Sequence, residues 1–283
     1  MNEWEEHLNR AQPSKNRNLR IRRRKIAPKY NLGKYDWRLT SKDFEKGEKI
    51  LEGELLINLV PELNRENTFD ALVFCQLAQR QRYDLQVELY RNMKLAGLLA
   101  PEKIMAEEDQ LLKLFRRDAS LYRQKYINVR SSAEFWLNTD YPEKLVEDAT
   151  SEHDNGEDLR DELVEKVRGV GYKTASLFML KLGYEDFATF DVWITRWMNY
   201  KGLDKKLGID FISEKGQVPD YLYKKAEKLM MEVADEEYPE YNLTAAKFTA
   251  VLWGKHAKWS QTAKESYIRT VANHTECNLE GFT

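Results

Sequence analysis

The sequence predicts an all-α fold, and three observations support this prediction. Apolar residues recur at helical spacing through most of the 283-residue chain, and segments of alternating apolar and polar residues are nearly absent. Residues typical of helix ends, such as Pro61 and Gly97, follow several of these apolar runs. A composition of 42% apolar and 33% charged residues is typical of a helical globular protein rather than a disordered chain.

The predicted helices follow one another with short breaks. The first spans residues 41–59 and ends before Pro61, and the next two begin at Thr68 and Asp84. The remaining predictions are helices at 121–137, 159–168, 172–182, 192–199, 221–234 and 244–258, an acidic loop at 147–158, and a loop with one short helix at 200–219.

Several classes of protein do not fit this composition. No run approaches the roughly 20 apolar residues of a membrane span, and the first 30 residues are polar and basic, unlike a signal peptide. The two cysteines, Cys75 and Cys277, and the four scattered histidines lack the spacing of a metal or iron–sulfur site. We expect an intracellular monomer, in the cytoplasm or nucleoid or in a nucleus, with no membrane contact and no metal.

The segment before the first predicted helix is strongly basic. Between residues 15 and 38 it carries ten Lys or Arg residues and a single acid, Asp36. Such a segment extends by self-repulsion and binds polyanions, so Arg22, Arg23 and Arg24 are candidate DNA contacts. A solvated tail, or a localisation signal in "RIRRRK", would account for the same residues.

The stretch "VRGVGYKTASLFML", residues 167–180, predicts two helices joined by a tight turn. Gly169 and Gly171 are both free to take positive φ angles between the two apolar patterns. The second helix begins with amide groups that lack intrahelical acceptors, and such groups bind a phosphate without reading base sequence. Many helical hairpins turn on glycine, so this motif alone indicates DNA binding only weakly.

Two charged residues near this turn form a more specific pattern. Lys173 stands in the first turn of the second helix, and Asp191 follows 18 positions later at the start of another helix. Alone, Lys173 is explained as an exposed lysine and Asp191 as a helix cap worth about 1 kcal/mol. Together, "GVGYK" with Lys173 and the later Asp191 followed by Arg196 form a far more specific functional signature than either residue alone.

The stretch "VRGVGYKTASLFMLKLGYEDFATFDVWITRWM" resembles the helix-hairpin-helix DNA glycosylases. It is most similar to the archaeal 8-oxoguanine DNA glycosylases of the second Ogg subfamily and less similar to endonuclease III. The resemblance extends more weakly from about residue 68 to "FTAVLWGK". It implies an all-α fold of two lobes with the active site between them. The implied divisions are a basic arm at 1–40, an N-terminal helix of the second lobe at 41–67, a mid-chain lobe at 68–190 with the hairpin motif at 159–182, the second lobe at 191–270 and a tail at 271–283.

The resemblance also implies a bifunctional DNA glycosylase and AP lyase of base excision repair. Lys173 would attack C1′ of the damaged nucleotide, expel the base and form a Schiff base, after which β-elimination cuts the strand. Asp191 would stabilise positive charge on the deoxyribose. Gly169 and Gly171 would hold a DNA phosphate, together with a monovalent cation on hairpin carbonyls, and no other cofactor is implied. Gln79 would fill the gap that the extruded base leaves.

Three departures from the family pattern affect the expected base pocket. Relatives usually carry His where this chain has Trp193, the Cys cluster of endonuclease III is absent, and about 30 residues follow Trp253, where close relatives end. Trp193 and Trp253 are candidate pocket residues, although buried core tryptophans are commoner. We expect the protein to remove 8-oxoguanine from double-stranded DNA. The alternatives are removal of oxidised pyrimidines, as in endonuclease III, or a non-catalytic helix-hairpin-helix protein that binds DNA.

Overall fold

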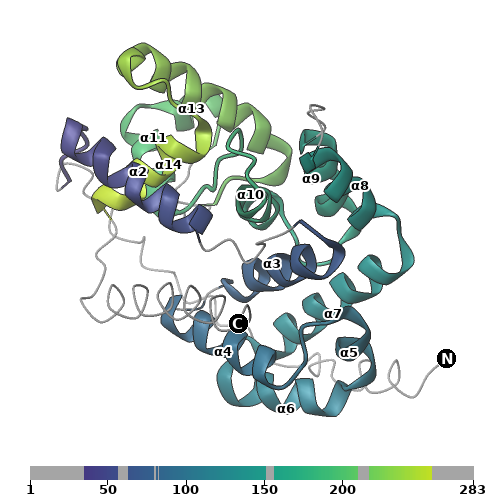
Figure 1. The fold of residues 1–283 in the computed structure, drawn as a ribbon. Helices are drawn as coiled ribbons and strands as arrows, with labels where there is room; N and C mark the ends of the chain where they lie inside the picture. Colours follow the sequence, from purple (N-terminus) through teal and green to yellow (C-terminus); the bar gives the residue numbers. More distant parts are fainter. Residues whose placement is uncertain are drawn as a thin grey trace, which may run out of the picture. The chain divides into compact units, whose positions relative to one another are not determined.

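The computed structural model describes residues 35–56, 63–79, 81, 83–150, 156–209 and 217–256 (Figure 1). Within these residues every regular element is a helix, which confirms the all-α prediction. The helices are α2 (Ser41–Leu56), α3 (Arg65–Leu77), α4 (Tyr83–Leu95), α5 (Pro101–Ala106), α6 (Glu108–Asp118), α7 (Tyr122–Asn138), α8 (Tyr141–Thr150), α9 (Gly156–Lys166), α10 (Tyr172–Lys181), α11 (Val192–Tyr200), α12 (Leu203–Leu207), α13 (Tyr223–Glu237) and α14 (Ala245–His256), with 3₁₀ turns η2 (Asp220–Leu222) and η3 (Pro239–Tyr241).

Helix boundaries differ from the predictions where capping or charge decides them. α3 begins at Arg65, before the expected Thr68, because the side chain of Asn64 accepts the N–H of Asn67 at 2.9 Å. The predicted acidic loop is wrong at both ends, since residues 147–150 end α8 and residues 156–158 begin α9. Acidic side chains in the first turn of α9 complement the helix dipole. The short helix expected within 200–219 is confirmed as α12, whereas α5, α6 and α8 were not predicted.

The main hydrophobic core is drawn from residues between Phe69 and Phe187. Trp136 of α7 is fully buried there, with its ring centroid 5.6 Å from that of Phe69 in α3 and 6.3 Å from that of Phe178 in α10. This packing holds α10, the helix that follows the glycine turn, against α3 and α7. The position of the turn is therefore set by the core.

α2 packs along α14, although the two helices lie about 200 residues apart in the chain (Figure 1). Gly47 makes this approach close, because a Cβ atom there would lie 2.7 Å from the Cα of Val251. Phe44 stacks on Tyr241 with a centroid separation of 3.7 Å, and Trp37 is 2% exposed. The described chain is therefore anchored from Trp37 onward.

Some of the sequence-based predictions concern residues outside the described part of the chain. These include Arg22, Arg23 and Arg24 of the basic arm and the tail at 271–283. The lobe boundaries stay predictions. Among the described helices, none has the length and hydropathy needed to cross a membrane.

Candidate active site

The glycine turn joins α9 to α10, and its two glycines have different conformations. Gly169 has a φ angle of +79°, and a Cβ atom there would lie 2.1 Å from the side chain of Asn128. Gly171 is the N-cap of α10 with an extended backbone, φ −100° and ψ 175°. Only Gly169 therefore requires glycine for its backbone angles, whereas both were expected to be free to take positive φ.

Lys173 lies in the first turn of α10, on the side of the helix that faces away from the core. Its side chain is exposed, whereas Ala175, Phe178 and Met179 of the same helix are fully buried. The apolar residues of α10 therefore fix the helix, and Lys173 projects from its amino-terminal end into the cavity described below.

Asp191 is the N-cap of α11, as the sequence predicted. Its Oδ1 accepts the N–H of Trp193 at 2.7 Å and the N–H of Ile194 at 3.0 Å. Burial raises the pKa of the Asp191 carboxyl, while the positive charges of Lys173 and Arg196 and the two amide hydrogen bonds act in the opposite direction. The carboxylate is thus held rigidly and sits within electrostatic range of Lys173.

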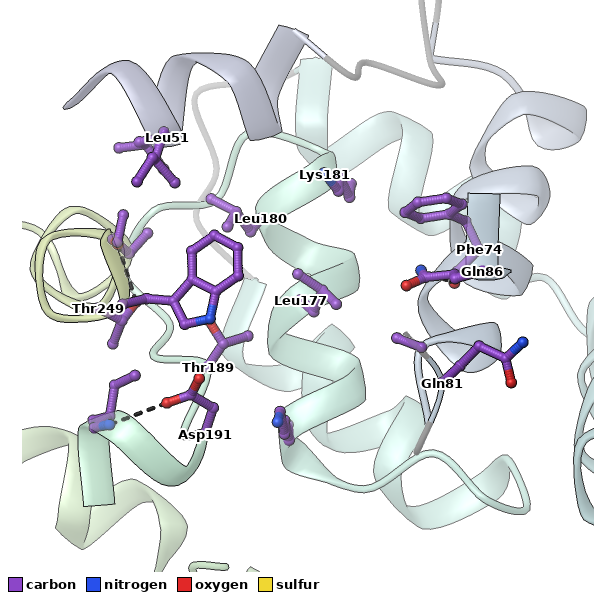
Figure 2. Close-up of a pocket in the computed structure, with 17 residues that line it drawn as sticks. Leu51, Phe74, Gln81, Gln86, Leu177, Leu180, Lys181, Thr189, Asp191 and Thr249 are labelled. Atoms are coloured by element: carbon purple, nitrogen blue, oxygen red, sulfur yellow. Dashed lines mark hydrogen bonds between the residues drawn. The ribbon is translucent and has the colours of Figure 1, made fainter. Parts of the chain in front are cut away.

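Lys173 and Asp191 line one cavity of about 250 Å³ (Figure 2). Its walls come from α2, α3, α4, α10, α11 and α14, together with the segments before α4 and α11. In Figure 2, Phe74 and Gln86 lie on one side of this space and Leu51 and Thr249 on the other. Trp253 of α14, one of the two candidate pocket residues, also lines the cavity.

Trp193, the other candidate pocket residue, is not among the residues that line this cavity. Its ring stacks on His256 at a centroid separation of 5.5 Å, and the guanidinium of Arg196 lies 4.6 Å from the ring centroid. The ring centroid of His256 in turn lies 4.3 Å from that of Trp37. Trp193 therefore belongs to an aromatic stack that joins α11 to α14 and to the start of the described chain.

Gln79 lies beside the glycine turn, just after α3. Its Nε2 donates a hydrogen bond of 2.7 Å to the carbonyl oxygen of Gly169, and its Oε1 accepts a longer one from Asn128. Two elements far apart in the sequence are joined by this contact. The structure thus joins Gln79 to the glycine turn, four residues before Lys173 in the chain.

Sequence reasoning missed several polar residues near the site. Arg160 and Glu227 form a buried ion pair behind the turn, and Tyr223 hydrogen-bonds the backbone just before Asp191. Lys181 and Gln86 line the cavity. A lysine inside the apolar pattern of α10 was the one local signal for these residues.

Comparisons with known proteins agree on one family. The family model described as "8-oxoguanine DNA glycosylase", Ogg-HhH, matches residues 56–237. The 8-oxoguanine DNA glycosylase/AP lyase of Thermoplasma volcanium is 31% identical over 155 residues, which cover 52% of this chain and 70% of that protein. The Aquifex aeolicus protein of the same name is 25% identical over 179 residues, which cover 59% of this chain and 68% of that protein.

Solved structures share the fold. The 8-oxoguanine DNA glycosylase of Methanocaldococcus jannaschii superposes with a TM-score of 0.53 at 20% identity, covering 76% of this chain and 87% of that one. The 8-oxoguanine glycosylase/lyase of the same organism has also been solved in complex with a 15mer DNA containing 8-oxoguanine. That structure gives a TM-score of 0.55 at 18% identity, covering 75% of this chain and 94% of that one. The fold is the two-lobed helix-hairpin-helix fold, and the chain belongs to the Ogg-HhH family of 8-oxoguanine DNA glycosylases.

Proposed function

We propose that the protein is a bifunctional DNA glycosylase and AP lyase that removes 8-oxoguanine from double-stranded DNA and cuts the strand. The observation that carries this proposal is that Lys173 and Asp191 line the same cavity, beside the glycine turn. The family match, and the names of the relatives from Thermoplasma and Aquifex, favour 8-oxoguanine over an oxidised pyrimidine.

Lys173 is the nucleophile in this proposal. Its amine attacks C1′ as the bond from C1′ to the base breaks, and the base leaves with the bonding electrons and takes up a proton. Opening of the sugar ring gives a Schiff base, and loss of a proton from C2′ then expels the 3′ phosphate. An amine attacks only when neutral, and Lys173 is exposed in the free protein. Burial beneath the extruded nucleotide favours the neutral amine.

Asp191 stabilises the positive charge that develops on the sugar as the base leaves. Its two amide hydrogen bonds fix the carboxylate before DNA binds, so little reorganisation is needed during the reaction. No organic cofactor or catalytic metal enters these steps.

The glycine turn holds a DNA phosphate. The amides at the start of α10 point out of the helix, and the helix dipole favours an anion there. A monovalent cation would bind hairpin carbonyl oxygens next to the same phosphate. The carbonyl of Gly169 already accepts the Gln79 amide, so the cation would share that oxygen or use its neighbours. In this arrangement Gln79 stands next to the bound strand, in a position to enter the space left by the base.

The basic arm, with Arg22, Arg23 and Arg24, adds sequence-independent affinity for the flanking duplex. A DNA substrate places the protein inside the cell, and we infer that a monomer acts, since Lys173 and Asp191 come from one chain.

Sodium borohydride trapping tests the proposal. The protein is incubated with a duplex that carries 8-oxoguanine opposite cytosine, and in parallel with a thymine-glycol duplex. A covalent adduct on the 8-oxoguanine duplex that is lost in Lys173→Gln supports the proposal. An adduct confined to thymine glycol would indicate the oxidised-pyrimidine alternative. DNA binding without an adduct on either duplex would exclude the lyase.

A further inference from the structure

Lys181 and Gln86 line the half of the cavity away from Asp191, on the same side as Gln81 (Figure 2). Both are buried, with Lys181 1% exposed and Gln86 4% exposed. The apolar lining around them includes Leu177, Leu180 and Trp253. Polar groups inside an apolar pocket are the usual source of ligand specificity.

The orientation of the Gln86 amide is fixed by the backbone of α3. Its Nε2 donates a hydrogen bond of 2.9 Å to the carbonyl oxygen of Phe74. A carbonyl oxygen accepts only from the NH₂ group, so this contact assigns the two ends of the amide. Gln86 therefore presents its oxygen, a hydrogen-bond acceptor, to the cavity.

Lys181 presents the opposite chemistry. It follows Lys173 by eight residues, or about 12 Å along α10, so it lies deeper than the nucleophile. Its Nζ lies 6.0 Å from the ring centroid of Phe74, the residue whose backbone holds Gln86. An ammonium group donates hydrogen bonds and accepts none. The cavity thus combines a donor and an acceptor around Phe74.

We propose that Lys181 and Gln86 select the extruded base by its edge, an inference that rests on the proposed glycosylase function. The ammonium of Lys181 donates to a carbonyl oxygen on the base, and Oε1 of Gln86 accepts the adjacent ring N–H. A 6-oxopurine carries this pair, with a carbonyl at C6 and an N–H at N1. A 6-aminopurine carries an amino group at C6 and an unprotonated N1. The Lys181 ammonium then faces a donor and Oε1 of Gln86 faces an acceptor, so neither buried group forms its hydrogen bond.

Read at the C6 and N1 edge, the pair selects a purine class rather than the oxidation itself, which gives both 8-oxopurines a carbonyl at C8 and an N–H at N7. Guanine and 8-oxoguanine have the same C6 and N1 groups, so Lys181 and Gln86 favour both over 8-oxoadenine. Discrimination between guanine and 8-oxoguanine falls to other contacts.

The test compares three duplexes under single-turnover conditions, carrying 8-oxoguanine, 8-oxoadenine or a preformed abasic site. Lys181→Met keeps the length of the side chain and removes the donor. A lost hydrogen bond to a charged group predicts excision of 8-oxoguanine slower by on the order of 10- to 100-fold. Cleavage of the abasic duplex should be unchanged, because no base fills the cavity, and 8-oxoadenine should lose none of its rate.

Two further variants separate base selection from a structural role. Gln86→Met removes the acceptor and should show the same pattern as Lys181→Met. Gln76→Met is the matched control, because Gln76 is as deeply buried, 1% exposed, but its Nε2 donates to the carbonyl oxygen of Asn128 and its side chain does not line the cavity. It should change all three rates by one common factor.

The outcomes distinguish this inference from the function on which it rests. Equal losses on all three duplexes in Lys181→Met, or an unchanged 8-oxoguanine rate, would overturn the inference alone. Failure of the unsubstituted protein to release the base from the 8-oxoguanine duplex would contradict the glycosylase function, and the inference would fall with it.

Discussion

Arg160 of α9 and Glu227 of α13 form a buried two-point ion pair, with N–O distances of 2.6 and 2.9 Å. Glu227 also accepts the N–H of Ala188 at 2.9 Å, and the guanidinium of Arg160 lies 4.0 Å from the ring centroid of Phe187. The pair therefore ties the helix before the glycine turn to the segment that leads into Asp191. Arg160 and Glu227 take no part in the proposed reaction. Their ion pair nevertheless fixes the spacing between the two candidate catalytic residues, Lys173 and Asp191.

Breaking this pair should strongly destabilise the protein. Arg160→Met leaves the Glu227 carboxylate buried without its cation, and removal of one partner of a buried pair costs about 3 to 5 kcal/mol. Urea denaturation measures the free energy of unfolding. Lys144→Met, which removes an exposed pair with Asp140, is the control and should cost less than about 1 kcal/mol. Similar losses in both variants would contradict the prediction.

Tyr223→Phe should slow base excision without weakening DNA binding. The Tyr223 hydroxyl accepts the N–H of Phe190 at 3.1 Å and donates to the carbonyl of Ala188 at 2.9 Å, so it holds the backbone before Asp191. Loss of these bonds should cost about 1 to 3 kcal/mol and reduce the single-turnover rate several-fold.

The matched control for this variant is Tyr141→Phe. The Tyr141 hydroxyl donates to the carbonyl of Leu159 in the main core, and the residue is as deeply buried as Tyr223. We expect a comparable loss of stability with an unchanged excision rate. A rate loss of equal size in the control would show that stability alone explains the effect of Tyr223→Phe.

The two glycines of the turn should respond differently to alanine. Gly169→Ala forces a Cβ atom into the side chain of Asn128 at a positive φ angle, and we expect a loss of about 1 to 3 kcal/mol and weaker DNA binding. Gly171→Ala meets only the Asp220 carboxylate at 3.5 Å, an ordinary contact, and should be tolerated. Thermal unfolding and DNA titration measure both effects. Equal tolerance of the two substitutions would refute the assignment of the turn.

Asp191→Asn should abolish excision but stabilise the folded protein at neutral pH. The pKa of Asp191 is raised in the folded state, chiefly by burial, so the native protein binds this proton more tightly than the unfolded chain. The free energy of unfolding of the unsubstituted protein therefore falls as pH rises from about 3.8 through the native pKa. Asparagine can still cap α11 through its side-chain oxygen, and it avoids the cost of burying an ionised carboxylate. Urea titrations at pH 4 and pH 7 should show its advantage growing with pH; a constant difference would count against the raised pKa.

Truncation of residues 1–34 should weaken the salt dependence of DNA affinity. The logarithm of the binding constant falls linearly with the logarithm of the salt concentration, and each lost phosphate contact makes this slope shallower by about 0.9. The truncation stops before Trp37 because that side chain is 2% exposed and packs on His256. An unchanged slope would show that the arm, with Arg22, Arg23 and Arg24, makes no contact with DNA.

The sequence by itself determined the local features of this protein. Helical periodicity located most of the helices, and the turn between α9 and α10 followed from Gly169 and the flanking apolar patterns. The cap formed by Asp191 also depends on residues within one helical turn. Such features are readable because propensity, capping and periodicity act between neighbours in the chain.

Only the tertiary structure decided which residues share the cavity. α2 and α14 close one wall through the close approach at Gly47, and this contact joins segments about 200 residues apart. Trp253 lines the cavity whereas Trp193 joins the stack with His256, although the sequence pattern offered both as pocket residues. Side-chain contacts between distant segments depend on how helices pack, and helical periodicity specifies the buried face of a helix without specifying its partner.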